Sequence, residues 1–170
     1  MTTLGYCRAW CLIAMVCSAC ASTSPTSSPG DDLSPIEKEA YIVFMDQIKT
    51  LHRDKNDMPL ILCTSIQSEN KPLPVSAALL DSLSKAVAGV AKLTFVDGAN
   101  CHENNMGETL TSDGSRAITF FGERDEDAQT REVTWFAGSV WGLLAGGGAF
   151  YKITMKDDIP TLETTGLWNI

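Results

Sequence analysis

The sequence predicts an α+β domain in which two N-terminal helices pack on an antiparallel, meander-type sheet of about five or six strands. Apolar residues recur at helical spacing in the early part of the domain, and runs of β-branched and aromatic residues follow. The connections after Arg116 are polar or rich in glycine, and most are too short for a crossover helix. The strands that they join should therefore pair as an antiparallel meander.

Residues 1–19 have the form of an export signal that is removed from the mature protein. Arg8 precedes the apolar run Ala9–Val16, which is shorter than the stretch of about 20 residues that a membrane-spanning helix needs. Residues 20–31 are rich in Ala, Ser, Thr and Pro and show no apolar periodicity, which predicts a flexible tether. Residues 32–170 should then form a single domain that is large enough to bury a core.

The end of this leader resembles a bacterial lipoprotein signal peptide. Ser18 and Ala19 are small residues directly before Cys20, and in that family the matching cysteine carries the lipid and becomes the mature N-terminus. The chain departs from the family pattern at Cys17, where leucine is usual. The alternative is ordinary signal peptidase cleavage, since Ala19-Cys20-Ala21 also has the small-x-small form. The resemblance implies an anchored protein that faces the periplasm or the exterior, and the alternative implies a secreted one.

The charge of the mature chain argues against a nucleic-acid partner. The full chain has 13 Lys and Arg against 21 Asp and Glu, and loss of the leader with its single basic residue, Arg8, changes the net charge from −8 to −9. Binding to phosphates requires clustered Lys and Arg, and the sequence contains no such cluster. We expect the membrane, through the lipid, as a partner, together with an envelope protein or a small apolar ligand, and we expect no cofactor.

Two cysteines, Cys63 and Cys101, remain once the leader and the lipidated residue are set aside. In an oxidising compartment a single pair of cysteines in one domain favours a disulfide. Closing this loop should stabilise the fold by on the order of 4 kcal/mol through the entropy of the unfolded chain.

Two helices are predicted from caps and apolar spacing. Ser34–Glu37 has the form of a capping box with proline at the first helical position, and the helix that it starts should end near His52. This helix should turn the following residues toward the core: Ile36, Ala40, Val43, Phe44 and Leu51. After the breaks at Pro72 and Pro74, a second helix should run up to Gly89. Its apolar residues are Leu79, Leu80, Leu83 and Val87.

Strands are predicted where short apolar or β-branched runs lie between turns. The expected strands are Leu60–Ile66, Leu93–Val96, Ala117–Phe121, Val133–Phe136, Phe150–Met155 and Leu162–Trp168. The first of them should bury Cys63. The acidic segment Glu123–Asp127 should form a solvated turn between Gly122 and Arg131, since it lacks the glycine and distal glutamate of an EF-hand loop.

The segment 135–151 is the main candidate for a binding surface, because aromatic residues flank an uncharged, glycine-rich stretch. A phosphate-binding loop is excluded, since no Gly-Lys-Ser/Thr opens a helix there. The patch hypothesis expects exposed side chains around a groove that meets lipid, peptide or another protein: Trp141, Leu143, Leu144 and Tyr151. The competing interpretation is a long hairpin whose aromatic residues fill the core and whose glycines permit a bend or bulge.

His52 and His102 are the two histidines of the chain, and neither has metal-binding spacing. His102 stands beside Glu103 and could act as a general base, yet neighbouring residues on an extended chain point in opposite directions. A small secreted hydrolase that uses His102 or His52 is therefore the alternative to a binding or structural module of the envelope.

The last forty residues resemble small bacterial envelope proteins that end in a glycine-rich turn and aromatic strands. The residues that carry this likeness are Ala137, Gly138, Gly146, Gly147, Gly148, Tyr151 and Trp168. No activity is implied by the resemblance.

Overall fold

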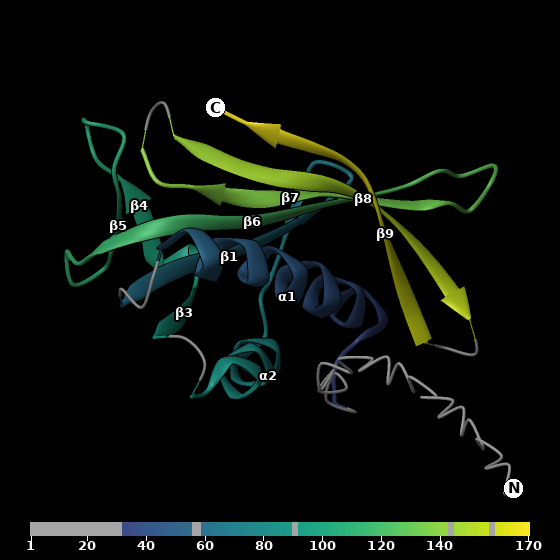
Figure 1. Ribbon diagram of the computed structural model, residues 1–170, viewed down its shortest axis with the longest axis horizontal. Helices are drawn as coiled ribbons and strands as arrows, with labels where there is room; N and C mark the ends of the chain where they lie inside the picture. The colour runs from purple at the N-terminus through teal and green to yellow at the C-terminus, as the bar shows by residue number, and fades with distance from the viewer. Residues whose placement is uncertain (1–31, 56–58, 90–91, 143–144, 157–158) are drawn as a thin grey trace, which may run out of the picture.

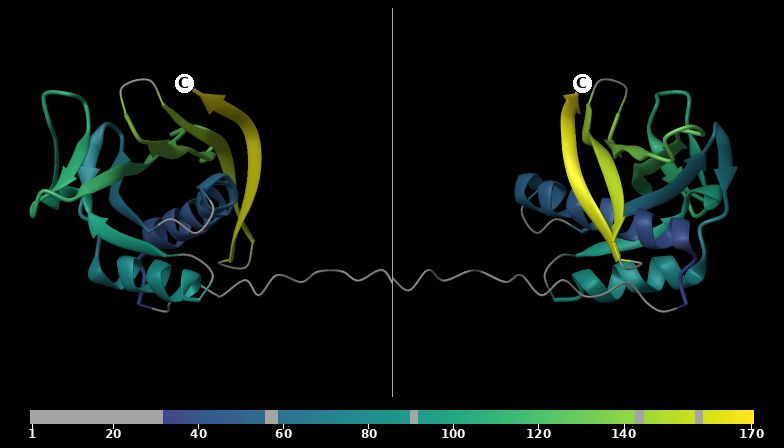
Figure 2. Two further views of the ribbon diagram at one scale, coloured as in Figure 1. Left: turned by 60° about the vertical axis from the view of Figure 1, so that its left-hand side comes forward. Right: turned by 90° about the vertical axis from the view of Figure 1, so that its right-hand side faces the viewer.

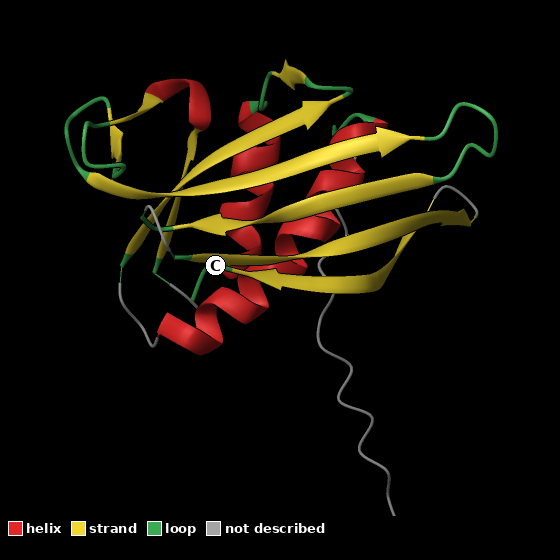
Figure 3. Ribbon diagram, turned by 90° about the horizontal axis from the view of Figure 1, so that it is seen from above, coloured by secondary structure: helices red, strands yellow, loops and turns green. Residues whose placement is uncertain are grey.

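A mixed sheet with helices on one face forms the domain in this computed structural model (Figure 1). The structure describes residues 32–55, 59–89, 92–142, 145–156 and 159–170. The helices are α1 (Pro35–Lys55) and α2 (Ala77–Val87), with the short 3-10 helix η1 (Gly98–Asn100). The strands are β1 (Leu60–Ser68), β2 (Lys71–Leu73), β3 (Leu93–Asp97), β4 (Cys101–Glu103), β5 (Thr109–Thr111), β6 (Arg116–Glu126), β7 (Val133–Val140), β8 (Gly146–Lys156) and β9 (Ile159–Asn169). Seen from above, the strands lie in front of the helices (Figure 3).

The α+β class is confirmed, but the expectation of two N-terminal helices on an antiparallel sheet is wrong. Only α1 precedes the sheet, while α2 lies between β2 and β3. The central strand β1 runs parallel to both β3 and β6. A parallel pair of strands needs a crossover connection, and α2 provides it between β1 and β3.

The predicted meander is present in the C-terminal half of the sheet. Strands β6, β7, β8 and β9 pair in sequence order, and every pairing is antiparallel. Three short strands were not predicted: β2 forms a hairpin with β1, and β4 and β5 add a second hairpin beside β6. The short connections therefore determine the second half of the sheet, as expected.

Helix α1 begins at the predicted capping box. The side chain of Glu37 accepts hydrogen bonds from the backbone N–H of Ser34 at 3.0 Å and from its hydroxyl at 2.7 Å. The backbone N–H of Glu37 donates in return to the Ser34 hydroxyl at 3.4 Å. These contacts satisfy backbone donors that the first turn of a helix leaves without intrahelical partners.

The core lies between the helices and one face of the sheet. Phe44 of α1 packs on Phe120 of β6, with ring centroids 4.7 Å apart. Trp135 of β7 and Tyr151 of β8 are both 1% exposed on the same side. Helix α1 contacts β6 through β9, and in Figure 2 the yellow end of the sheet curves past this helix. The opposite face of β6–β9, which we call the open face, therefore carries the alternate side chains of each strand.

Cys63 and Cys101 form the predicted disulfide, with Cα atoms 6.3 Å apart. Cys63 is buried in β1, as expected, and Cys101 begins β4. In β1, the residues on either side of Cys63 are Leu62 and Thr64, which face the helices. Cys63 therefore points to the other side of the sheet. The disulfide thus fastens the β4–β5 hairpin to the central strand.

Replacement of either cysteine should destabilise the protein to the same degree. We expect Cys63→Ser and Cys101→Ser each to lower the free energy of unfolding by on the order of 4 kcal/mol and Tm by roughly 10 °C, because each substitution opens the same loop. The double variant should unfold at the Tm of the single variants. Thermal unfolding of the three proteins measures this, and unequal single variants, or free thiols in the unsubstituted protein, would contradict the disulfide.

Candidate functional site

Four aromatic side chains form a continuous row on the open face. Phe136 lies at its centre and stacks on Phe150, with ring centroids 4.9 Å apart and an interplanar angle of 26°. Its ring centroid lies 5.4 Å from that of Phe121 and 5.3 Å from that of Trp168, and the latter two rings are 5.9 Å apart. We call Phe121, Phe136, Phe150 and Trp168 the aromatic row. Phe150 is 45% exposed and the other three are partly exposed, so the row is accessible to a ligand.

Glycines of β7 and β8 make room for the Trp168 indole. A Cβ atom on Gly138 would lie 2.5 Å from Cζ2 of Trp168, and one on Gly148 would lie 2.6 Å from its Nε1. The indole N–H donates to the carbonyl oxygen of Ala137 at 3.3 Å. The glycines therefore let the ring lie close to the backbone of β7 and β8, where any larger residue would displace it.

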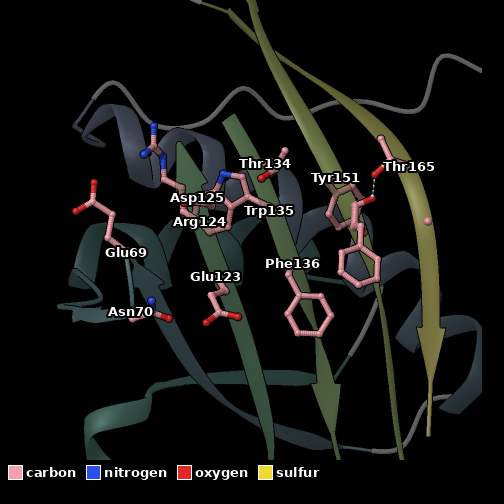
Figure 4. A pocket seen from close by; sticks show the side chains of 12 residues that line it. Glu69, Asn70, Glu123, Arg124, Asp125, Thr134, Trp135, Phe136, Tyr151 and Thr165 are labelled. Carbon is pink, nitrogen blue, oxygen red and sulfur yellow. Dashed lines mark hydrogen bonds between the residues drawn. The ribbon is translucent and has the colours of Figure 1, made fainter. Parts of the chain in front are cut away.

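A cleft of about 690 Å³ lies beside the aromatic row. Glu123 of β6, Phe136 of β7 and Phe150 of β8 are direct cross-strand neighbours and line it together. Figure 4 shows Glu123 and Phe136 next to each other, with Asn70 on the far side of the carboxylate. The cleft thus combines aromatic faces with carboxylates.

The carboxylates of this cleft come from two places in the chain. Glu123 and Asp125 are alternate residues of β6 and share the open face. Glu69 belongs to the turn between β1 and β2, where Glu69 and Asn70 both adopt left-handed conformations, with φ of 52° and 61°. This conformation suits a two-residue hairpin turn and brings both side chains to the cleft. We call Glu69, Glu123 and Asp125 the acidic rim.

Arg124 also borders the cleft, but its charge is already paired. Its Nε donates to Glu39 at 2.8 Å, and its terminal nitrogen donates to Glu126 at 2.9 Å. Burial opposes the charged form, yet the hydrogen bonds with both carboxylates outweigh it and raise the pKa of Arg124. Glu39 also accepts the indole N–H of Trp135 at 3.0 Å. This buried cluster therefore ties α1 to β6 and β7 and leaves the acidic rim unneutralised.

A second cleft, of about 610 Å³, lies between α1 and the ends of β7–β9. The Tyr151 hydroxyl donates to Asp46 at 3.0 Å and accepts from the side chain of Gln47. Burial, together with the charge of Asp46, raises the pKa of Tyr151 despite the bond from Gln47. Tyr151 therefore stays protonated at neutral pH and acts as a donor.

Two residues of the predicted patch, Trp141 and Tyr151, line the same second cleft but differ in exposure. Trp141 is 38% exposed, whereas Tyr151 is 1% exposed and belongs to the hydrophobic core. Tyr151 is therefore not the exposed side chain that the patch hypothesis expects. Leu143 and Leu144 lie outside the described residues, as does the candidate lipidation site Cys20.

The alternative catalytic residues do not meet in either cleft. His102 is an exposed residue of β4 and lines neither of them. His52 belongs to α1, but its side chain lies outside the described part of the chain. Across the described ranges, no group of three or more His, Cys, Asp and Glu residues is arranged to hold a metal ion.

The acidic segment has a different structure from the turn that the sequence suggested. Strand β6 continues through Glu126, and the turn to β7 follows it. Asp127 begins this turn by accepting backbone N–H bonds from Gln129 at 2.9 Å and Thr130 at 2.7 Å. These bonds lower the pKa of Asp127. The extension of β6 is what brings Glu123 and Asp125 onto the open face.

The aromatic row and the acidic rim were not predicted as a site from the sequence. Phe120 and Phe121 are adjacent, so the pattern reads as a strand buried on both faces. The pairing of β7, β8 and β9 would have indicated the position of Trp168. In this register Gly138 pairs with Gly148, and Gly148 pairs with Trp168. Paired glycines beside tryptophan indicate a ring that lies flat on the sheet.

Gly148→Ala should disturb both the hairpin and the Trp168 ring. The added methyl group would press on the backbone of β7 and on the indole, so we expect a loss of about 1–3 kcal/mol in the free energy of unfolding and a changed tryptophan emission spectrum. The matched control is Gly147→Ala, whose methyl group would approach the carbonyl oxygen of Trp168 only to an ordinary 3.4 Å. Denaturant unfolding followed by fluorescence tests the pair, and equal losses would contradict the close packing.

Comparisons with family models, with curated proteins and with solved structures find no match to this chain. Among the described helices, none is long and apolar enough to cross a membrane. The geometry of the open face and its cleft therefore carries the functional argument.

Proposed function

We propose that this protein is an exported binding module of the bacterial cell envelope, anchored through a lipid on Cys20, and that its ligand contacts the aromatic row. The single observation that carries the proposal is a row of four contacting aromatic rings on a sheet face, of which Phe150 is exposed and the other three are partly exposed. In Figure 3 no helix of the described chain lies over that face. Contiguous exposed aromatic surface is uncommon in proteins without a partner and is typical of binding sites.

Sequence supports the location of this module. The export signal and the small residues before Cys20 resemble a lipoprotein leader, and the composition of residues 20–31 suits a tether between a lipid and a folded domain. A disulfide between Cys63 and Cys101 suits an oxidising compartment. For the hydrolase alternative, His102 lines neither cleft, and the side chain of His52 lies outside the described part of the chain.

Occupation of the aromatic row can be tested without knowing the ligand. We expect Thr165→Cys to react with a maleimide several-fold more slowly in intact cell envelopes than in the purified protein, since this exposed residue lines the cleft beside Phe150 and a bound ligand would cover it. The matched control is Met106→Cys, at a site that is 67% exposed and distant from the row in sequence. Its rate should be the same in both settings.

Mass analysis of each variant would verify that Cys63 and Cys101 remain paired before labelling. Equal rates for Thr165→Cys in envelopes and in the purified protein would contradict the proposal. Slower labelling at both positions would indicate general shielding by the envelope and would also contradict an occupied aromatic row.

The lipid anchor predicts the mass of the mature protein. Protein purified from the membranes of its host should begin at Cys20 and carry a diacyl or triacyl adduct, because the family cysteine is acylated before cleavage. The intact mass of the protein measures the lipid adduct. The increase in mass on reduction measures the two hydrogens that the cysteines of the disulfide gain. An unmodified chain that begins at Ser22 would contradict the anchor and indicate a secreted protein.

A further inference from the structure

The geometry points to a specific ligand for the cleft beside the aromatic row: an extended segment of a partner polypeptide that presents lysine or arginine side chains. This inference rests on the proposed function, since it names the chemistry of the ligand that the open face would bind. Phe136 and Phe150 supply the ring faces, and the acidic rim supplies the opposite charge.

The acidic rim is not neutralised within the described part of the protein. No described Lys or Arg forms an ion pair with Glu69, Glu123 or Asp125. Arg124 is held by Glu39 and Glu126, and in Figure 4 its guanidinium points away from the Glu123 carboxylate. A ligand that enters this cleft therefore meets net negative charge, within a chain whose overall charge is also negative.

A lysine on the open face is also paired with another residue. Lys152 of β8 binds Glu132 at 2.5 Å, and this contact raises the pKa of Lys152. The side chain is 38% exposed, and it does not line the cleft. Lys152 therefore does not neutralise the acidic rim.

Aromatic faces beside carboxylates favour a cation over other ligands. A positive group above Phe136 or Phe150 is attracted by the ring quadrupole and at the same time pairs with the neighbouring Glu123. A purely apolar ligand would take the charge of the half-buried Glu123 out of water without compensation, which is unfavourable. An anionic ligand would be repelled. A cation is the ligand class that satisfies both parts of the cleft.

The spacing of the carboxylates favours an extended polypeptide over a single small amine. Glu123 and Asp125 are alternate residues of one strand, so their Cα atoms are separated by roughly 7 Å. Alternate side chains of an extended peptide that lies along β6 have the same separation. Glu69 adds a third carboxylate from the β1–β2 turn at the side of the cleft. Several basic side chains of one segment can therefore be bound together.

The test uses the full mature protein in detergent and two labelled peptides. The first is an acetylated, amidated five-residue peptide with lysine at alternate positions and serine between them, and the second replaces each lysine by glutamate. We expect the lysine peptide to bind, the glutamate peptide not to bind, and binding to weaken as salt is raised. The double variant Glu123→Gln with Asp125→Asn should bind the lysine peptide roughly tenfold more weakly. Phe150→Ala should also weaken binding.

The matched control is Glu103→Gln, which removes one exposed carboxylate of β4 away from the cleft. It should bind like the unsubstituted protein, and thermal unfolding would verify that every variant is folded. Equal binding of both peptides, or unchanged binding by the double variant, would overturn the inference. A neutral chitin tetrasaccharide serves as a further probe. If it binds in a manner that needs Phe150 but not Glu123, the open face remains a binding site and the cationic ligand is excluded.

Discussion

The alternation of side chains along β6 links the core of this protein to its candidate binding face. Strand β6 is hydrogen-bonded to β1 on one side and to β7 on the other. Phe120 points toward the helices, and Phe121 and Glu123 therefore point to the open face. A slip of one residue would exchange the two sets and move Phe120 into solvent. Burial of the core thus also sets where the aromatic row and the acidic rim lie.

The buried Arg124 cluster has a second consequence beyond attaching α1 to the sheet. Glu39 receives both the Arg124 guanidinium and the Trp135 indole, so removal of this carboxylate would leave two buried donors unpaired. Glu126 completes the pairing, and its pKa is lowered chiefly by the hydrogen bond with Arg124. Because these acids retain the guanidinium on the helix side, the acidic rim keeps its negative charge. The electrostatics of the cleft therefore depend on contacts beneath the sheet.

Local and covalent features were predictable from sequence, while the pairing of distant strands was not. The capping box at Ser34 and the disulfide at Cys63 each depend on a few residues of recognisable type. The parallel pairing of β1 with β3 could have been inferred from the intervening α2, but the pairing of β1 with β6 has no local signal. The open face could not be predicted from the sequence. The helices cover one side of the sheet, and the residue pattern of a strand does not show which of its two faces they cover.

Packing within the fold explains the position of Trp168 in the aromatic row, but it does not explain the exposure of Phe150. Trp168 covers the glycines of the hairpin and bonds to the Ala137 carbonyl, so its position follows from packing. Phe150 leans on Gly166, where an added Cβ would meet its ring at 3.4 Å, and yet it remains 45% exposed. The ring nevertheless stacks on Phe136, one strand from Glu123. The pairing of accessible rings with an unneutralised carboxylate is best explained by a ligand that contacts both.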